Sequence, residues 1–221
     1  MSANAPADLQ RIYEGRFAAN LDYRRAVWRV LIDDFFQAFI QPTDAVLDLG
    51  CGYGEFINQI RCGEKFAMDL NPDLPKRIAA DVKPLLQDCS ARWSLPQNRL
   101  NAIFTSNFFE HLPDKAALGR TLDECHRCLK PGGKLIALGP NIKLVPGSYW
   151  DFWDHYLPLT EASIKEALEN RGYKIERCLR GFLPYTMAGG PRYPLVFLRI
   201  YLRLQPAWRL FGKQFLVIAR K

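Results

Sequence analysis

The feature that most constrains the fold is a short apolar run that ends in three glycines. Residues 45–49 are Ala-Val-Leu-Asp-Leu, and Gly50, Gly52 and Gly54 follow. The run indicates a buried strand, and glycine lets the backbone adopt positive φ and approach a ligand closely. Apolar spacing over 55–61 predicts a helix, whose N-terminal N–H groups would face the same ligand. The pattern predicts a nucleotide-like ligand at this turn; a purely structural tight turn is the alternative.

Strand-like and helix-like patterns alternate along the rest of the chain. Such alternation predicts a doubly wound α/β fold, in which ligands bind outside the carboxyl ends of the strands. Further strands are expected over 65–69, 84–88, 100–106, 134–139, 173–179 and 215–219, with a turn at 131–133. Helices are expected over 9–40 (one or two), over 115–128, and from Thr160 to Gly172.

Asp69 lies at the end of the second expected strand, about 20 residues after the first glycine. A carboxylate there can accept hydrogen bonds from both hydroxyls of a ribose. The alternative is an aspartate that caps the turn before Asn71 and Pro72. The glycine spacing is G-x-G-x-G rather than the G-x-G-x-x-G of dinucleotide sites, and no Gly-Lys-Ser/Thr element is present. A nicotinamide-dependent oxidoreductase is therefore disfavoured but stays an alternative.

Length and composition predict one intracellular globular domain. The 221 residues are 48% hydrophobic and 24% charged, which excludes a mainly disordered chain, and no apolar window is long enough for a membrane span. The first residues lack the basic start and apolar run of a secretory signal. The six cysteines are therefore expected as reduced cytoplasmic thiols, with Cys125 and Cys128 packed on a helix, and no metal site is expected.

Five sequence elements occur in order between about residues 40 and 180. They are VLDLGCGYG at 46–54, Asp69, Asp88 with Cys89, NFFEHL at 107–112 and LKPGG at 129–133. Together they resemble the motifs of class I S-adenosylmethionine-dependent methyltransferases. The resemblance implies a Rossmann-like, seven-stranded, mostly parallel sheet with helices on both faces and an antiparallel last strand.

The resemblance also implies which residues meet the cofactor, S-adenosylmethionine. Gly50, Cys51 and Gly52 would lie against its methionine part, with Gly54 completing the loop. Asp48 would orient the ammonium group. Carboxylates suit a ligand that carries an ammonium and a sulfonium better than they suit a diphosphate.

The adenosine part would be bound by residues from the next strands. Asp69, followed by Leu70, would hold the ribose. Asp88 and the backbone of Cys89 would contact the adenine, although Asp88 also fits a surface loop. Asn107, at the end of the fourth strand, would lie beside the sulfonium.

Methyl transfer to a hydroxyl needs a proton acceptor near the reacting atoms. Residues 149–156, Tyr-Trp-Asp-Phe-Trp-Asp-His-Tyr, follow the fifth strand on the expected ligand side. His155 is the preferred base, with Asp151 as a catalytic carboxylate, and Glu110 and His111 are further candidates. One alternative is an aromatic lid whose His155 hydrogen-bonds the backbone. Another is a cofactor-binding regulatory module without catalysis.

Basic charge is concentrated at the C-terminal end. Residues 177–221 hold nine lysines and arginines and no acid, more than enough to account for the net charge of +7. The apolar stretch 193–204 carries Arg199 and Arg203 four apart, which fits a helix on an anionic membrane, with contact through 192–213. A helix packed over the sheet edge, with its arginines in solvent, is the alternative. No nucleic acid is expected.

One methyltransferase domain is expected over 1–221. The C-terminal stretch also resembles a bacterial subgroup of small methyltransferases associated with polysaccharide assembly. Together with the aromatic segment and the basic apolar segment, that resemblance favours a lipid-linked or nucleotide-linked sugar as the acceptor. The expected reaction is methyl transfer to an oxygen, in preference to a nitrogen, of a small or glycan-like molecule. The enzyme would be cytoplasmic, or peripheral at the inner membrane surface. The expected parts are a helical cap at 1–41, a cofactor-binding core at 42–140, an aromatic lid at 141–160 and a basic apolar insertion at 181–212.

Overall fold

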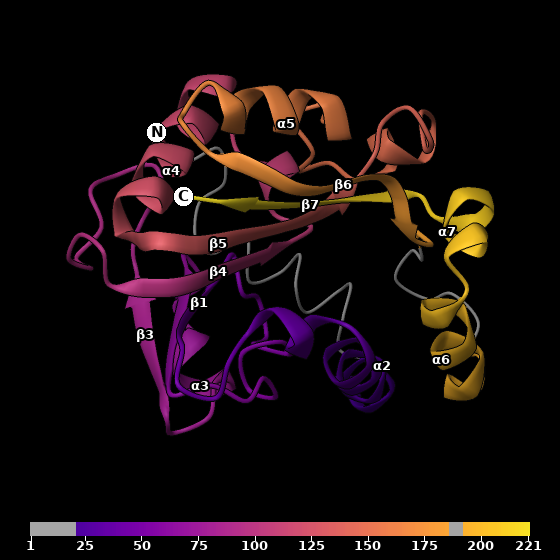
Figure 1. Ribbon diagram of the computed structural model, residues 1–221, viewed down its shortest axis with the longest axis horizontal. Helices are drawn as coiled ribbons and strands as arrows, with labels where there is room; N and C mark the ends of the chain where they lie inside the picture. The colour runs from indigo at the N-terminus through magenta and orange to yellow at the C-terminus, as the bar shows by residue number, and fades with distance from the viewer. Residues whose placement is uncertain (1–20, 186–191) are drawn as a thin grey trace.

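The computed structural model describes residues 21–185 and 192–221, and within them a seven-stranded sheet forms the centre of the molecule (Figure 1). The strands are β1 (Ala45–Leu49), β2 (Glu64–Asp69), β3 (Val82–Leu86), β4 (Leu100–Ser106), β5 (Leu129–Pro140), β6 (Lys174–Leu183) and β7 (Gln214–Arg220). Their order is β3-β2-β1-β4-β5-β7-β6, with parallel pairing from β3 to β5 and β7 antiparallel to both β5 and β6. The predicted Rossmann-like sheet is confirmed.

Helices cover both faces of this sheet (Figure 1). Helices α4 (Lys115–Cys128) and α5 (Glu161–Glu169) lie on one face; α2 (Leu21–Asp34), the 3-10 helix η2 (Phe36–Phe39) and α3 (Leu74–Arg77) lie on the other. Successive side chains of a strand point to opposite faces. In β1, Leu47 and Leu49 therefore pack on the α4 side and Val46 on the α2 side. Burial on both faces accounts for the apolar run before the glycines, which only Asp48 interrupts.

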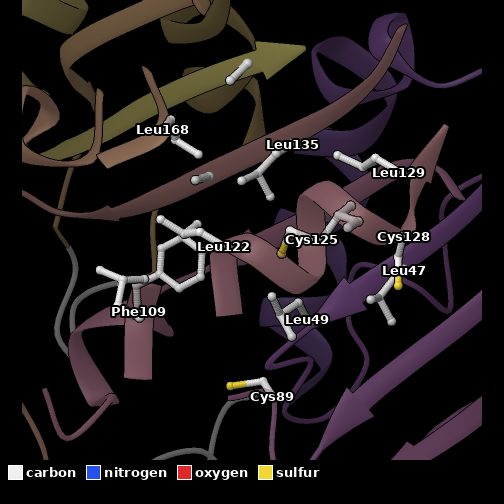
Figure 2. Close-up of a cluster of buried hydrophobic side chains, with 14 of the residues drawn as sticks. Leu47, Leu49, Cys89, Phe109, Leu122, Cys125, Cys128, Leu129, Leu135 and Leu168 are labelled. Carbon is white, nitrogen blue, oxygen red and sulfur yellow. The ribbon is translucent and has the colours of Figure 1, made fainter. Parts of the chain in front are cut away.

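The core on the α4 side contains cysteines that act as apolar packing residues. Cys125 and Cys128 are fully buried, and Figure 2 shows their sulfur atoms among leucines from β1, α4 and β5. Burial raises the pKa of Cys125 well above its usual value and that of Cys128 to about 11. Both thiols therefore stay protonated near neutral pH, which suits neither a thiolate metal ligand nor a nucleophile. All six cysteines are free.

The helix predicted over 55–61 was wrong. The segment forms consecutive turns whose hydrogen bonds span either three or four residues. The amides of Gln59 and Ile60, for example, both donate to the carbonyl oxygen of Phe56. A side chain takes one backbone group that a helix would use, because Nε2 of Gln59 donates to the carbonyl oxygen of Glu55 at 2.8 Å. Phe56, Ile57 and Ile60 are buried, so the apolar spacing serves a packed turn.

Several predicted boundaries also moved; the strand predicted over 173–179, for example, extends to Leu183 as β6. The third strand is β3, two residues earlier than the predicted 84–88, with Val82 beside Lys65 and Leu86 beside Asp69. Pro84 is tolerated there because β3 is the edge strand and needs no further backbone donor on its open side. The turn predicted at 131–133 lies within β5 as a bulge, where the pairing with β4 shifts register between Leu129 and Lys134. Residues 9–20 of the predicted N-terminal helices lie outside the described ranges.

Two helices separate the last two strands. They are α6 (Leu195–Arg203) and α7 (Gln205–Phe211), and they lie at the end of the sheet where β5 and β6 terminate (Figure 1). Their inner side is anchored: the hydroxyl of Tyr201 donates to the carbonyl oxygen of Phe182 at 2.5 Å, and Trp208 is buried. In the ranges that the structure describes, every helix is too short or too polar to cross a bilayer.

Candidate active site

The loop that follows β1 is shaped by its glycines. Gly50, Gly52 and Gly54 have φ angles of 69°, 54° and 70°. At Gly50 a side chain is also excluded sterically, because a Cβ atom there would lie 2.1 Å from Cγ of Phe108. The Gly50 amide donates to the carbonyl oxygen of Met68 at 2.9 Å. The loop is therefore held against β2 at the carboxyl edge of the sheet, where the sequence predicted a ligand.

Asp69 contacts the glycine loop from the neighbouring strand. Its Oδ2 accepts a hydrogen bond from the Gly52 amide at 2.9 Å, and its Oδ1 accepts one from the Asn71 amide at 2.9 Å. Burial raises the pKa of Asp69, and hydrogen bonds from the backbone of Asn71, Gly52 and Leu70 oppose that rise. The carboxylate thus faces the glycine loop, and it also caps the turn at Asn71, which was the alternative interpretation of this residue.

Carboxylates crowd the start of the loop. Asp48 is only 3% exposed. Burial raises the pKa of Asp48 well above its usual value, and the negative charges of Glu55 and Asp69 raise it further. Arg24 offsets part of this charge through an ion pair of 2.8 Å with Glu55. Burial is the main cause that raises the pKa of the Cys51 thiol, and the negative charges of Asp48 and Asp69 raise it further. A bound cation would relieve this repulsion, which suits an ammonium or sulfonium group.

Asn107 follows β4 directly and has an unusual backbone conformation. Its φ is 50°, in the left-handed region that few residues other than glycine adopt. The amide donates to the carbonyl oxygen of Leu138 in β5 at 2.9 Å, and Nδ2 lies 3.1 Å from Oγ of Ser106. Backbone strain at a strand end is typical of binding and catalytic positions. The structure therefore places Asn107 at the edge where the sulfonium was expected.

The residues expected at the adenine lie beyond β3. Asp88 is exposed, and its Oδ1 accepts a hydrogen bond from the Ser90 amide at 2.8 Å. Cys89 is buried, its carbonyl oxygen accepts the indole N–H of Trp93 at 2.8 Å, and its sulfur lies 3.4 Å from Oγ1 of Thr121. Asp88 is accessible to a ligand, whereas Cys89 anchors the segment to the core.

His111 and Asp154 form a carboxylate–imidazole pair. Nδ1 of His111 lies 2.8 Å from the carbonyl oxygen of Asp154 and 3.2 Å from its Oδ2. Because both oxygens accept, Nδ1 carries a proton, and the lone pair of the neutral ring is on Nε2. Burial lowers the pKa of His111, but the bond to Asp154 and the charges of Glu110 and Asp154 raise it overall. The side chain is 27% exposed, and Nε2 of the neutral ring is the atom that could accept a proton.

His155 lies beside this pair in a more enclosed position. It is 7% exposed, its ring stacks on Phe152 with centroids 4.9 Å apart, and its edge contacts with Tyr149 and His111 are both at 4.8 Å. Asp151, the expected catalytic carboxylate, is exposed. The aspartate that pairs with an imidazole here is Asp154.

The aromatic segment after β5 divides between core and surface. Tyr149 is fully buried, and its hydroxyl donates to the carbonyl oxygen of Leu157. Trp150 and Trp153 are 54% and 86% exposed. The buried tyrosine fixes the segment, and the two tryptophans present apolar rings to solvent.

Glu110 is a buried acid that joins the two parts of the site. Its carbonyl oxygen accepts the amides of Tyr156 and Leu157 at 2.8 and 3.1 Å, which ties the 3-10 helix η3 (Phe109–His111) to the segment after β5. Burial raises the pKa of Glu110 to about 7, and the charge of His111 opposes that rise. Its Oε2 makes no hydrogen bond within the described residues.

One carboxylate and two imidazoles lie together in a combination that divalent metal sites use. They belong to Glu110, His111 and His155. Each offers a ligand atom, and these atoms lie within 4.8 Å of one another. The sequence predicted no metal here. His111 presents only Nε2 to such an ion, because its Nδ1 is held by Asp154.

Sequence reasoning found these segments but not their pairing. Asp151 and Asp154 lie in one short segment without helical or strand periodicity, so the sequence could not show which carboxylate points inward. The placement of Glu110 and His111 directly after a strand-end motif was the available signal for the cluster. The contact between His111 and Asp154 comes from the path of the chain after β5.

Comparison with known proteins gives a consistent result. A family model described as a methyltransferase domain matches residues 21–177. The chain is 24% identical over 147 residues to the demethylmenaquinone methyltransferase of Symbiobacterium thermophilum, an alignment that covers 59% of this chain and 57% of that protein. It is 27% identical over 146 residues to a Mycolicibacterium smegmatis protein assigned as an S-adenosylmethionine-dependent methyltransferase, covering 58% and 56%. The chain thus spans less than two thirds of either relative.

The fold is shared with solved structures. One is an S-adenosylmethionine-dependent methyltransferase from Archaeoglobus fulgidus, with a TM-score of 0.67, 21% identity, and coverage of 96% of this chain and 99% of the other. At this level of identity the likeness concerns the fold alone.

Proposed function

Because the chain belongs to the methyltransferase domain family and uses S-adenosylmethionine as its cofactor, we propose that it methylates an oxygen atom of a small or glycan-like acceptor. The observation that carries the proposal is the His111–Asp154 pair beside the glycine loop. The ring of Phe108 packs on Gly50, and the carbonyl oxygen of Phe108 accepts the amide of His111 at 3.0 Å, so the pair and the loop adjoin. An oxygen acceptor must lose a proton, and this pair supplies a base for it.

The residues around the loop fit the cofactor by their chemistry. Asp48 is a buried carboxylate in a cluster of like charges, which favours the ammonium group of the methionine part. Asp69 faces the loop and suits the ribose hydroxyls. The loop from Gly50 to Gly54 presents backbone without side chains, and Leu70, Asp88 and Cys89 are assigned to the adenosine part. Asn107 is assigned to the sulfonium end.

The proton step follows from the tautomer of His111. When bound, S-adenosylmethionine supplies an electrophilic methyl group. As the oxygen–carbon bond forms and the sulfur–carbon bond breaks, Nε2 of His111 takes the proton of the acceptor hydroxyl. Asp154 keeps Nδ1 protonated and stabilises the resulting imidazolium through its carboxylate. The pair thus orients the base and offsets the charge it acquires.

His155 is the second candidate for the base. Its contact with the ring of His111 places it at the same site, but three rings enclose it and it is only 7% exposed. We assign it a packing role that fixes His111. The variants His111→Asn and His155→Asn separate the two assignments: the first should lose most of the turnover and keep cofactor binding. A larger loss for His155→Asn would reverse them.

The acceptor class rests on the two exposed tryptophans of the segment after β5. Trp150 and Trp153 present exposed rings, and aromatic rings stack on the apolar faces of sugars. Together with the resemblance of the C-terminal stretch to methyltransferases of polysaccharide assembly, this supports a sugar acceptor, free or lipid-linked. In the lipid-linked case residues 192–213 would make peripheral contact with an anionic membrane, at its inner surface.

The test is release of S-adenosylhomocysteine from S-adenosylmethionine in the presence of a panel of nucleotide-linked and lipid-linked sugars. The proposal expects turnover with at least one sugar, with the methyl found on oxygen by mass spectrometry, and loss of turnover in Asp69→Ala. Cofactor binding without turnover across the panel would favour the non-catalytic regulatory module. A methyl found on nitrogen would overturn the acceptor assignment.

A further inference from the structure

Exposed apolar side chains are concentrated in one part of the molecule. Among the described residues, ten large apolar side chains are exposed, and Leu86 is the only one that precedes residue 150. The others belong to the segment after β5 and to α6, α7 and the residues beside them. They are Trp150, Trp153, Tyr193, Val196, Phe197, Ile200, Leu204, Leu210 and Phe211.

The outer side of α6 and α7 is apolar although the inner side is already packed. Leu202 and Trp208 are buried, and the Trp208 ring lies 5.0 Å from that of Phe182 in β6. The helices therefore do not need Phe197 or Phe211, which are 59% and 61% exposed, to hold their position. A second apolar face on helices that are already anchored indicates a further contact surface.

The segment that carries this face is purely basic, and its acidic neighbours come from α2. Residues 177–221 contain no aspartate or glutamate. Arg203 and Arg209 are exposed among the apolar residues, and Arg199 reaches an acid only on another helix, Asp34 of α2, at 3.6 Å.

Asp22 of α2 lines a cavity with Leu195 and Arg199, but Arg25 and Arg29 line it too, so cations still outnumber acids there. Apolar residues interleaved with an excess of cations suit the interface of an anionic bilayer. A protein interface core would more commonly be depleted of charge.

This surface and the active site share one edge of the sheet. β6 runs parallel to β5 because both pair antiparallel with β7, so α6 begins beyond the carboxyl ends of the strands. The Asn141 amide, just after β5, donates to the carbonyl oxygen of Lys213 at 3.0 Å. The rings of Phe152, from the aromatic segment, and Tyr185, after β6, lie 6.1 Å apart. The residues that flank α6 and α7 in the chain, Tyr185 and Lys213, therefore contact the segment after β5 that carries the tryptophans.

We propose that Trp150, Trp153 and the outer face of α6 and α7 form one docking surface for an anionic phospholipid bilayer, and that the methyl acceptor is a lipid-anchored molecule presented at that bilayer. The acceptor part rests on the proposed function, and the docking part specifies the membrane contact named there without depending on methyl transfer. Tryptophan suits the headgroup level, where amphipathic rings partition, and the phenylalanines enter the acyl boundary. Docking would then turn the carboxyl edge, with His111, toward the lipid.

Sedimentation with vesicles tests the docking part. The full chain should be retained on vesicles of equal parts phosphatidylglycerol and phosphatidylcholine. It should not be retained on vesicles of phosphatidylcholine alone. The double variant Phe197→Ser with Phe211→Ser should lower retention about tenfold. The double variant Arg203→Gln with Arg209→Gln should lower retention about fivefold for each cation that it removes. The matched control is Leu86→Ser, an exposed leucine on β3. Equal retention of the double variants and the control would overturn the docking surface.

Hydrogen exchange on the same vesicles tests the orientation with the unaltered protein. Amides of 149–156 and 195–211 should exchange more slowly with vesicles present, and those of α3 and β3 should not change. Protection of α3 and β3 instead would place the membrane on another face and contradict the shared edge.

The acceptor part is tested with radiolabelled S-adenosylmethionine and the lipid extract of the producing cells, incorporated into the phosphatidylglycerol vesicles. Label should enter the organic-soluble fraction, and Phe197→Ser with Phe211→Ser should reduce it while S-adenosylhomocysteine binding stays unchanged. Label confined to water-soluble products would overturn a lipid-anchored acceptor but leave methyl transfer intact. If the unaltered protein does not bind S-adenosylhomocysteine, that result would instead contradict the proposed function.

Discussion

Nδ1 of His111 is held by two oxygens of one residue, the carbonyl oxygen of Asp154 at 2.8 Å and its carboxylate Oδ2 at 3.2 Å. The carbonyl contact fixes the ring to the path of the chain after β5, and the carboxylate contact responds to charge. Removing the carboxylate alone should therefore leave the ring in place and change its basicity. This separation makes the pair testable by substitution.

Asp154→Asn should lower kcat by about tenfold to hundredfold, because a general base contributes roughly 10²–10⁴ and part of that contribution is lost. The bond to Asp154 and its charge raise the pKa of His111, so their loss should lower it. The base acts unprotonated, and the acidic limb of the pH–rate profile should therefore move to lower pH. The profile should be compared with that of Asp151→Asn. A larger effect of Asp151→Asn would restore the interpretation made from the sequence.

Glu110 should make stability depend on pH. Burial raises its pKa from 4.5 to about 7, so the folded protein retains a proton that the unfolded chain releases. This contribution is present at low pH and is lost as pH rises from about 4.5 to about 7; it amounts to about 3 kcal/mol at most. Urea unfolding at pH 5 and pH 8 should show that the free energy of unfolding falls less between these two pH values in Glu110→Gln than in the unaltered protein. The exposed Glu166→Gln is the control, and an equal decline in all three would contradict the shift.

Gly50→Ala should destabilise the protein and abolish cofactor binding. The positive φ alone costs about 1–2 kcal/mol, and the added Cβ would lie 2.1 Å from the ring of Phe108. Phe108→Ala in the same chain should recover part of the stability, because it removes the clash and leaves the backbone strain. Gly147→Ala is the control, since Gly147 has a φ of −78° and a methyl group added there would meet no neighbour within 4 Å among the described residues. Unchanged melting temperature in Gly50→Ala would contradict the close contact.

Removal of metal ions should leave activity unchanged. The cluster of Glu110, His111 and His155 has suitable ligand types, but the proposed reaction uses Nε2 of His111 as the base, and a metal bound there would block it. Dialysis against a chelator should therefore preserve the turnover number, and added Zn²⁺ should inhibit. Loss of activity on chelation, restored by one divalent ion, would assign the cluster to metal binding instead.

The sequence predicted the central strands well because their apolar runs are bounded by turn residues. β4 and α4 were predicted with their observed bounds, and the capping pair of Thr160 and Ser163 marks the start of α5. The helix over 55–61 failed because Gln59 bonds to backbone that a helix would use, an effect with no periodic signature.

The cofactor side of the site was more predictable than the acceptor side. Asp69 and the glycines follow strand ends, where topology brings them together. The pairing of His111 with Asp154 joins residues 43 apart in the chain through irregular segments, and only the path of the chain reveals it. The exposure of Phe197 and Phe211 was similarly undetermined, because an apolar helix face looks the same in sequence whether it is buried or not.

Binding of S-adenosylmethionine at the acidic, glycine-lined edge beside β1 underlies every assignment made for the site. Isothermal titration with S-adenosylhomocysteine tests it most directly, because the product analogue binds without turnover. We expect one site per chain, a strong loss of affinity in Asp69→Ala, and a loss of about fivefold in Asp88→Asn, the worth of one hydrogen bond. Absence of binding at millimolar ligand, or equal affinity in Asp69→Ala, would contradict it.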